Sequence, residues 1–453
     1  MREEQVTQTF FQFGVFPQHE RSNHFANVSN MIDQHPEIIQ LVALDLRVCG
    51  EKKENKKGAG RNGISAESIL RCAILKRMYV GVSYYGLEFD LIDRESFRTF
   101  SKLEIGKTPT KSTLQRTISA IGPETWEAIN RVLVQHAREE GVEDGSVIRI
   151  DSTVVEALMH EPTDNSLLND AVRVMARLFR DIRKLPGGAG FRWKNYERRA
   201  KRHSFDIQFC KNDDVRKDLY KNLLGFTKKT ADALENALNE PFHLSSIDGI
   251  AWGSRVTTFV PLVRRVIDQC ERRVFNGEKV PARDKLVSLF EYHADIIIKG
   301  SRGVEFGHKI NITSTPSNLI TDLVIEAGNP ADSERLMPML KRHTEQFGSP
   351  PKQVACDGGY ASARNLADAK ELGVKDMAFH KKCHLSVEDM CESEAVYNTL
   401  RNFRAGIEAN ISCLKRAYGL SRCNWRGLRH FQAYVWSAAV AYNLATLARL
   451  CTS

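Results

Sequence analysis

Residues 146–155, SVIRIDSTVV, are rich in β-branched side chains and predict a β-strand. Upstream, apolar residues recur at helical spacing between Ile69 and Met78, so residues 1–145 are expected to form a helical domain. Downstream, residues 161–292 also have a helical pattern. The strand therefore lies between two helical regions, which argues against an all-α protein.

Strand and helix patterns alternate through the rest of the chain. The runs 304–313 and 319–327 flank turn residues, which predicts a hairpin. Short strands are expected at 353–359 and 375–380, and helices over 333–344, from 362, over 394–416 and over 428–450. We therefore predict an α/β fold, a mixed sheet with helices on both faces. Its segments are 146–160 and 293–453, interrupted by the helical insertion 161–292.

Composition and charge narrow the class of protein. Of the 453 residues, 42% are apolar and 27% are charged, which argues against a disordered, collagenous or coiled-coil chain. Lys and Arg outnumber Asp and Glu by 65 to 56, which favours a polyanionic partner. We see no signal-peptide pattern, and the apolar stretch 431–450 contains Gln432, Asn443 and Arg449. A cytoplasmic protein without a membrane span is therefore expected.

Part of the basic excess lies in the insertion. Residues 173–202 contain eleven Lys and Arg and only two acids. The aromatic residues among them are Phe179, Phe191, Trp193 and Tyr196. Interleaved cations and aromatics suit a nucleic-acid backbone and unpaired bases. A solvated helix face with buried aromatics has the same pattern, and for the aromatics alone we favour that interpretation.

Two carboxylates are expected at the ends of strands. Asp151 is predicted to end the first strand, and Asp357 a later one. Reacting groups gather beyond the carboxyl ends of strands in an α/β sheet, so parallel neighbours would bring both to one crevice. Gly358 and Gly359 allow a sharp turn after Asp357 and leave room for a bulky substrate.

A third carboxylate, Glu408, is the only acid between Tyr397 and His430, where there are seven Lys and Arg. On a helix, Arg404, Glu408 and Lys415 would share one face. The adjoining apolar stripe, expected to pack on the sheet, consists of Leu400, Phe403, Ile407 and Leu414. One carboxylate flanked by cations suits a site where a metal meets phosphate.

Oxygen ligands of this kind hold Mg²⁺, and crowded carboxylates repel one another unless a divalent ion neutralises them. We therefore expect Asp151, Asp357 and Glu408 to be catalytic residues that bind two Mg²⁺ ions, with Mn²⁺ as a substitute, for phosphoryl transfer. Taken singly, each has an ordinary explanation. The aspartates are common turn residues, and Glu408 suits a helix ion pair with Arg404.

Together these residues resemble the DDE transposases of bacterial insertion sequences, of the broad IS4/IS5-like kind with an RNase H-like catalytic core. The matching segments are IDST at Asp151, CDGGYAS at Asp357 and RNFRAGIEANISCLKRAYGL at Glu408. The family often shows Tyr-x₂-Arg-x₃-Glu-x₆-Lys around its glutamate. Arg404, Glu408 and Lys415 keep that spacing, whereas Arg401 stands at the tyrosine position.

The resemblance implies a transposase that binds the terminal inverted repeats of its element, cleaves DNA at the ends and joins the 3′ ends to target DNA. Arg404 and Lys415 would contact phosphates, and Arg401 and Arg416 are further candidates for DNA binding. Residues 1–145 would be the helical DNA-binding domain. The expected partners are double-stranded DNA, of element ends and target, and a second subunit in a homodimer. The expected location is the bacterial cytoplasm, in association with the nucleoid.

Other activities remain open on the sequence. An RNase H-like nuclease that hydrolyses without joining would use the same carboxylates. A non-catalytic DNA-binding protein derived from a transposase has no reason to keep three acids on a basic surface. A metal hydrolase of small phosphoesters would account for the acids but not for the basic stretches.

Overall fold

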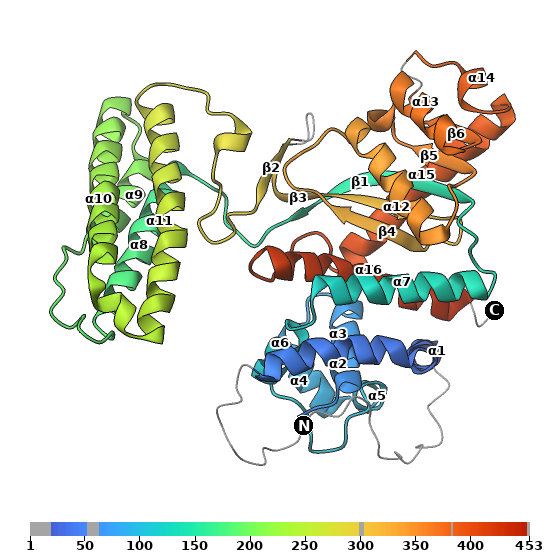
Figure 1. Ribbon diagram of the computed structural model, residues 1–453, viewed down its shortest axis with the longest axis horizontal. Helices are drawn as coiled ribbons and strands as arrows, with labels where there is room; N and C mark the ends of the chain where they lie inside the picture. The colour runs from blue at the N-terminus through green and yellow to red at the C-terminus, as the bar shows by residue number, and fades with distance from the viewer. Residues whose placement is uncertain (1–19, 52–62, 299–302, 382–383, 451–453) are drawn as a thin grey trace. The chain divides into compact units, whose positions relative to one another are not determined.

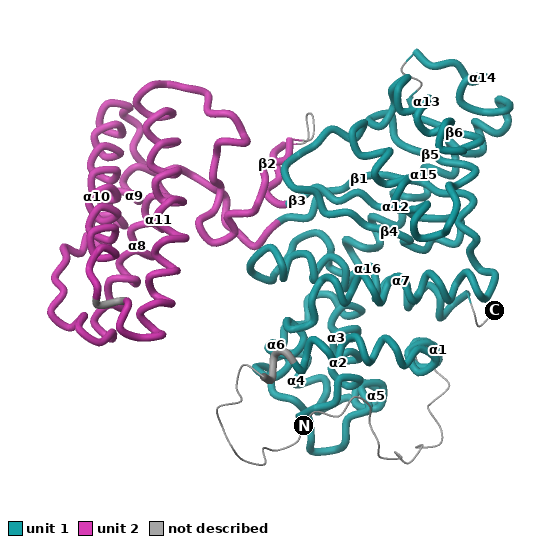
Figure 2. Tube along the Cα trace, in the orientation of Figure 1, with its two compact units in different colours: residues 1–156, 308–453 teal, residues 157–307 magenta. Residues whose placement is uncertain are grey.

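The computed structural model describes residues 20–51, 63–298, 303–381 and 384–450. Its contacts divide the chain into two compact units, Met1–Glu156 with His308–Ser453 (unit 1) and Ala157–Gly307 (unit 2), coloured separately in Figure 2. Unit 1 contains the N-terminal helices together with most of the sheet. Unit 2 contains the helical insertion and the short strand that follows it.

The N-terminal part of unit 1 is helical, as predicted. Its helices are α1 (Glu20–Asp33), α2 (Pro36–Glu51), α3 (Ala66–Met78), α4 (Tyr84–Asp93), α5 (Glu95–Phe100), α6 (Lys111–Ile118) and α7 (Pro123–Glu139). Helix α3 is buried on nearly all sides and packs on α2, α6 and the last helix, α16 (Leu428–Leu450). Its Arg71 is fully buried because Glu67 and Asp33 pair with the guanidinium.

A six-stranded mixed sheet has the order β2-β3-β1-β5-β6, with β4 paired to β3 (Figure 1). The strands are β1 (Val147–Glu156), β2 (Asp295–Ile298), β3 (Val304–Ser314), β4 (Ile320–Ile325), β5 (Gln353–Cys356) and β6 (Asp376–Phe379). Strands β3 and β4 form the predicted antiparallel hairpin, and β1, β5 and β6 run parallel. This arrangement is consistent with an RNase H-like core and confirms the predicted fold class.

Helices cover the sheet of unit 1 (Figure 1). They are α12 (Leu336–Phe347), α13 (Ala363–Leu372), α14 (Val387–Met390), α15 (Glu394–Ala417) and α16. Helix α16 packs along α7 and on β4, where Asn443 is fully buried. Its amide accepts a hydrogen bond from the Ile320 amide and donates to the Ile320 carbonyl and to Asn130. The polar residue inside this apolar helix therefore pairs with the backbone at the start of β4.

Unit 2 is built on four helices, α8 (Asp164–Ile182), α9 (Glu197–Phe209), α10 (Asp213–Asn239) and α11 (Ile247–Val274). They pack on one another around a common apolar core. Trp252 is fully buried in that core, and its indole Nε1 donates to the carbonyl of Leu178. Within the described ranges of the whole chain, no helix combines the length and apolar character needed to cross a bilayer.

Two details differ from the sequence-based expectations. The four-residue strand β2 was not predicted, because so short a run has no resolvable alternation and is stabilised by pairing with residues 304–307 of β3. Asp151 does not end β1, which continues to Glu156. The pairing of β1 with β5 ends at Ile150, immediately before Asp151.

Candidate functional site

The parallel pairing of β1 with β5 brings two of the predicted carboxylates to adjacent positions. Ile150 pairs with Cys356, so Asp151 and Asp357 are the next residues on the two neighbouring strands. Strand β5 ends at Cys356, and the chain turns at once into the short 3-10 helix Gly358–Tyr360. The two strands are therefore parallel neighbours, as the predicted shared crevice requires.

Helix α15 carries the third carboxylate. Ser393 begins the helix by accepting a hydrogen bond from the amide of Val396. Leu400, Ile407 and Leu414 are buried, and the helix packs on β1, β5 and β6, as the apolar stripe predicted. The same docking places the face of Arg404 and Glu408 beside the ends of the paired strands.

A single guanidinium, that of Arg404, contacts all three carboxylates. Its Nη2 lies 3.0 Å from Oδ2 of Asp151 and 3.3 Å from Oδ1 of Asp357. Its Nη1 lies 3.0 Å from Oε1 of Glu408. The Arg404 side chain is only 10% exposed. The structure therefore gathers four of the residues singled out in the sequence into one cluster.

The three acids differ in their exposure to water. The side chain of Asp151 is 13% exposed, that of Asp357 41% and that of Glu408 67%. Burial raises the pKa of Asp151 to about 6, although the Arg404 charge and the Ser152 amide lower it, while Asp357 and Asp332 raise it further. The ionised form of Asp151 is therefore held at a cost, which a second positive charge would reduce.

The two positions after Asp357 must be glycine because a side chain at either would clash with a neighbouring residue of the protein. A Cβ on Gly358 would lie 2.8 Å from Cβ of Lys381, and one on Gly359 would lie 2.8 Å from Oδ2 of Asp332. Asp332 is an acid that the sequence did not point to. It lies in the short 3-10 helix Asp332–Glu334, and Nζ of Lys309 lies 2.5 Å from its Oδ1. No sequence motif marks it, since only the packing of two loops brings it near Asp151.

Among the described residues, no group of three or more His, Cys, Asp or Glu side chains is arranged to hold a metal ion. The physical reason is that Arg404 lies between the acids and takes up their oxygens. The donors themselves fit Mg²⁺ or Mn²⁺, because all are carboxylate oxygens from three separate elements. Nε of Arg404 is buried without a hydrogen-bond partner among the described residues, so the guanidinium is incompletely bonded there.

The remaining predicted DNA-binding residues lie along α15. Arg401 is exposed, one turn before the cluster. Lys415 is partly exposed and Arg416 is exposed, and both belong to the last turn of the helix. The structure therefore places Arg404 within the acidic cluster and leaves Arg401 and Arg416 at the surface.

The basic stretch of unit 2 separates into exposed cations and packed aromatics. The ring of Phe179 stacks on Trp193 at 4.5 Å between centroids and on Phe191 at 5.8 Å, and Tyr196 stacks on Phe226. Phe179 is fully buried, and Tyr196 is nearly so. All eleven Lys and Arg of residues 173–202 are exposed. The interpretation favoured for the aromatics, that they pack in a core, is thus confirmed.

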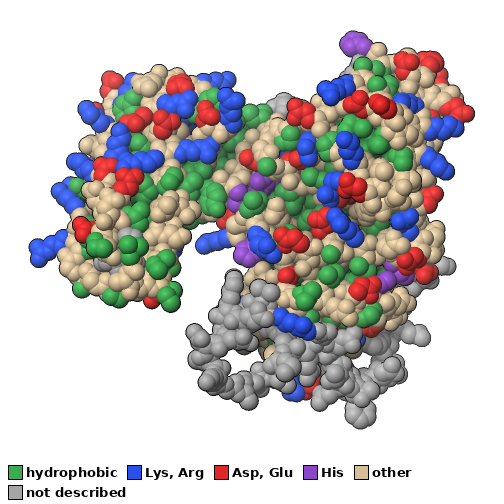
Figure 3. Space-filling model, viewed as in Figure 1, with side chains coloured by type: hydrophobic (Ala, Val, Ile, Leu, Met, Phe, Trp, Pro, Cys, Tyr) green, Lys and Arg blue, Asp and Glu red, His purple; other side chains and the backbone are tan. Residues whose placement is uncertain are grey.

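Several of those cations form no ion pair within the described part of the chain. They are Arg177, Arg183, Arg192, Lys194, Arg198, Arg199 and Lys201, whereas Arg173, Arg180, Lys184 and Arg202 pair with nearby acids. Lys and Arg side chains lie across the visible surface of unit 2 in Figure 3, with acids interspersed. Unit 2 therefore presents unpaired positive charge to solvent on α9 and the loop before it.

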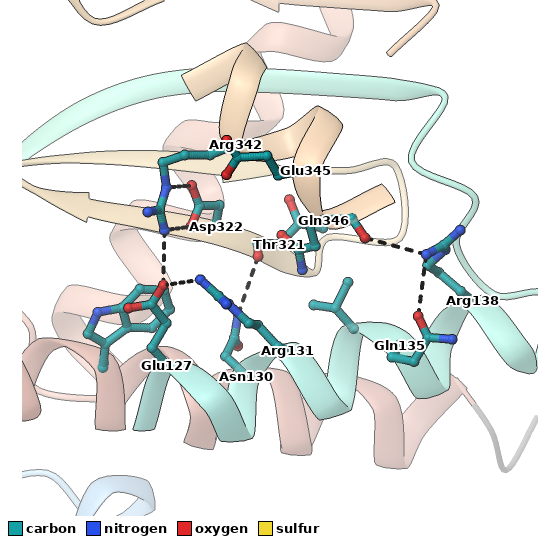
Figure 4. A pocket seen from close by; sticks show the side chains of 12 residues that line it. Glu127, Asn130, Arg131, Gln135, Arg138, Thr321, Asp322, Arg342, Glu345 and Gln346 are labelled. Atoms are coloured by element: carbon teal, nitrogen blue, oxygen red, sulfur yellow. Dashed lines mark hydrogen bonds and ion pairs between the residues drawn. The ribbon is translucent and has the colours of Figure 1, made fainter. Parts of the chain in front are cut away.

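A polar cavity of about 310 Å³ lies between α7, β4 and α12, and no residue of the acidic cluster lines it (Figure 4). Its cations already have partners. Arg342 bonds both oxygens of Asp322 and also contacts Glu127, which pairs with Arg131. Because these charges compensate one another, the cavity is a structural ion-pair network that joins α7 to the sheet.

The comparison with protein families agrees with the fold. Residues 296–444 match the family described as the transposase DDE domain. The matched segment contains Asp357, Arg404 and Glu408 and begins after Asp151. Residues 296–444 are therefore similar to the DDE domain of transposases, which supports a DDE transposase. No curated protein and no solved structure matches it.

Proposed function

We propose that this protein is the transposase of an IS4/IS5-like insertion sequence, which cuts DNA at the ends of its element and joins the 3′ ends to target DNA. The observation that carries this proposal is the contact of one guanidinium with Asp151, Asp357 and Glu408. Two of these acids lie within the transposase DDE domain. The family match covers Asp357 and Glu408, and the geometry adds Asp151 to them.

Asp151, Asp357 and Glu408 are proposed as the catalytic residues and as the ligands of divalent metal. Mg²⁺ held there would supply Lewis-acid activation of the attacking and leaving oxygens of the DNA phosphate. The carboxylates come from two strand ends and a helix that pack on one sheet, so their spacing is set by rigid elements. Asp357 and Glu408 are the exposed members, and they would meet the DNA first.

Arg404 is proposed to have two successive partners. Without metal, it forms ion pairs with all three carboxylates and offsets part of their charge. With the carboxylates holding metal, the Arg404 guanidinium would be free to bind a phosphate of the DNA, for which its planar fork is suited. Lys415, Arg401 and Arg416 would contact the backbone farther along the same helix.

DNA contacts beyond the cluster are proposed for both units. The helices of residues 1–145 would recognise the terminal repeats. The exposed, unpaired cations of unit 2 would hold the duplex through its phosphates. Two protein subunits would be needed to act on both element ends, so we propose a homodimer in the DNA complex.

The test is strand cleavage and joining by the purified protein, with labelled element-end DNA and a supercoiled target plasmid, in Mg²⁺ or in EDTA. Glu408→Gln is the informative variant, because Glu408 is exposed and the change removes charge with little change in shape. We expect Mg²⁺-dependent nicking and plasmid joining that Glu408→Gln loses while DNA binding is kept.

Two other results would replace the proposal. Mg²⁺-dependent cleavage without joining, even when a free 3′-hydroxyl donor is supplied, would indicate a nuclease. DNA binding without cleavage in either condition, unaffected by Glu408→Gln, would indicate a non-catalytic DNA-binding protein.

A further inference from the structure

Arg149 is a buried cation that lies two residues before Asp151 on β1, and alternation along a strand directs both side chains to the same face. The residue is 4% exposed. Its guanidinium uses four of its N–H groups. The acceptors are Ser314 Oγ at 2.8 Å, the Phe403 carbonyl at 2.9 Å, Asn318 Oδ1 at 2.6 Å and Asn410 Oδ1 at 2.6 Å.

All of these acceptors are neutral. Within the described residues, no carboxylate forms an ion pair with Arg149. A buried charge without a counterion is costly to keep, and a neutral residue of similar size would avoid the cost. The burial of this guanidinium is therefore better explained by what it holds together than by stability alone.

The bonds of Arg149 flank the functional part of α15. Phe403 immediately precedes Arg404, and Asn410 lies two residues after Glu408. The Arg149 guanidinium also lies over the Phe403 ring, 4.6 Å from its centroid. The amide of Asn410 continues the network to the Asn318 carbonyl and the Tyr442 hydroxyl. Arg149 thus joins the strand of Asp151 to the helix of Glu408.

Gly406, midway between Arg404 and Glu408, is the complement of Arg149. A Cβ on Gly406 would overlap Nη1 of Arg149 and would lie 3.0 Å from its Cζ. The backbone of Gly406 is helical, so no unusual conformation calls for glycine at this position. Glycine in the interior of a helix lowers stability relative to alanine. The close approach of the guanidinium is therefore the physical reason for its presence.

We propose that Arg149 is a positioning residue for the reaction. By filling the space that Gly406 leaves open, it sets how closely α15 approaches β1, and hence the separation of Asp151 from Glu408. The inference rests on the proposed function of these two carboxylates as metal ligands. It adds a pair of residues, Arg149 and Gly406, that touch neither metal nor DNA and act through the geometry of the acids.

The experiment compares Gly406→Ala, Arg149→Lys and the double variant with wild type in full-length protein. Mn²⁺ binding is measured by calorimetry without DNA, and strand cleavage is measured as a function of metal concentration. Gly406→Ala should raise the Mn²⁺ dissociation constant and the half-saturating metal concentration by about tenfold or more, with DNA affinity unchanged. Lysine is narrower and flexible, so Gly406→Ala should add little to Arg149→Lys.

The matched control is Gly225→Ala. Gly225 also lies inside a helix, α10, but a Cβ there would meet nothing within 4 Å. This variant should bind metal and cleave DNA as wild type does. If Gly406→Ala does not fold, Arg149→Lys decides, with weakened Mn²⁺ binding expected at unchanged DNA affinity.

The results distinguish a failure of the proposed function from a failure of the positioning role. Wild-type protein that binds no Mn²⁺ would overturn the proposed function, and this inference with it. If wild type binds Mn²⁺ and both Gly406→Ala and Arg149→Lys bind it equally well, only the positioning role is wrong. Independent, multiplying effects in the double variant would also overturn it, because they would show that residues 149 and 406 do not act on each other.

Discussion

Nη2 of Arg404 lies 3.0 Å from Oδ2 of Asp151, and this ion pair joins residues 253 positions apart in the chain. The same nitrogen reaches Asp357 at 3.3 Å. A positive side chain thus lies where the proposed mechanism requires a divalent ion to be held. Arg404 offsets only part of the charge of the acidic cluster, and a metal ion would compete with it for the oxygens.

Arg404→Gln is therefore expected to bind Mn²⁺ more tightly than wild type in the absence of DNA, by about tenfold or more, at a pH above the pKa of Asp151. Its strand cleavage should nevertheless fall by about a hundredfold, since phosphate loses its cation. Calorimetry and a cleavage assay measure the two effects. Arg401→Gln, on the same helix but exposed, should leave Mn²⁺ affinity unchanged. Weaker Mn²⁺ binding by Arg404→Gln would mean that the guanidinium preorganises the site.

Asp151→Asn is expected to stabilise the metal-free protein at neutral pH. Burial raises the pKa of Asp151 from 3.8 to about 6, a difference that corresponds to about 3 kcal/mol at most. The folded protein holds this proton more tightly than the unfolded chain does. The wild type therefore loses the stability that protonated Asp151 contributes as the pH rises from about 4 to about 6.

The increase in the free energy of unfolding caused by Asp151→Asn should grow between about pH 4 and about pH 6 and stay constant above that interval. Denaturant unfolding in EDTA measures it. Asp144→Asn is the control of opposite sign. Hydrogen bonds from Ser146 lower the pKa of Asp144, so its contribution is present above its ordinary pKa and lost as the pH falls. An Asp151→Asn variant that is less stable than wild type at pH 8 would contradict the prediction.

Neutralising the exposed cations of α9 should weaken DNA binding without affecting specificity. For Arg198→Gln/Arg199→Gln/Lys201→Gln, the slope of log affinity against log salt should decrease by about 1 for each cation that contacts phosphate. The control is Lys228→Gln/Arg264→Gln/Arg272→Gln, which removes equal charge from unit 2 at ion-paired positions. Equal salt slopes in the two variants would show that net charge alone matters.

Phe179→Ala should destabilise unit 2 by about 3–5 kcal/mol, because the ring is fully buried and stacks on Trp193. Denaturant unfolding followed by tryptophan fluorescence would report the loss. Phe205→Ala, at a side chain that is 62% exposed, should change stability by only about 0.5 kcal/mol or less. A Phe179 variant of normal stability with impaired binding of single-stranded DNA would restore the base-stacking interpretation.

Features with local causes could be predicted from the sequence. The hairpin, α15 and α16 were found because the alternation of apolar side chains is repeated within each element. Glu408 stood out because it is the only acid in a basic helix. The cluster of Asp151, Asp357 and Glu408 followed from the order of elements, since parallel strands end at one edge of a sheet.

Features that depend on contacts between residues far apart in the chain were not predicted from the sequence. Strand β2 is only four residues long and depends on pairing with β3. Asp332 is brought toward Asp151 by two loops that pack on each other, where Gly359 leaves it room. The hydrogen bonds of Arg149 were missed as well, because its acceptors lie more than 160 residues away in the chain.

By itself, the sequence determined most of the helices and strands, though not β2, and which acids stand at the start of the turn after β5 and on α15. These features depend on side-chain periodicity along the chain. Tertiary structure alone decided that Arg404 would form ion pairs with all three acids and that Gly406 would admit Arg149 between helix and strand. The reason is physical. The cost of burying a charge and the space for a side chain are set by neighbours in three dimensions, which residues far apart in the chain supply.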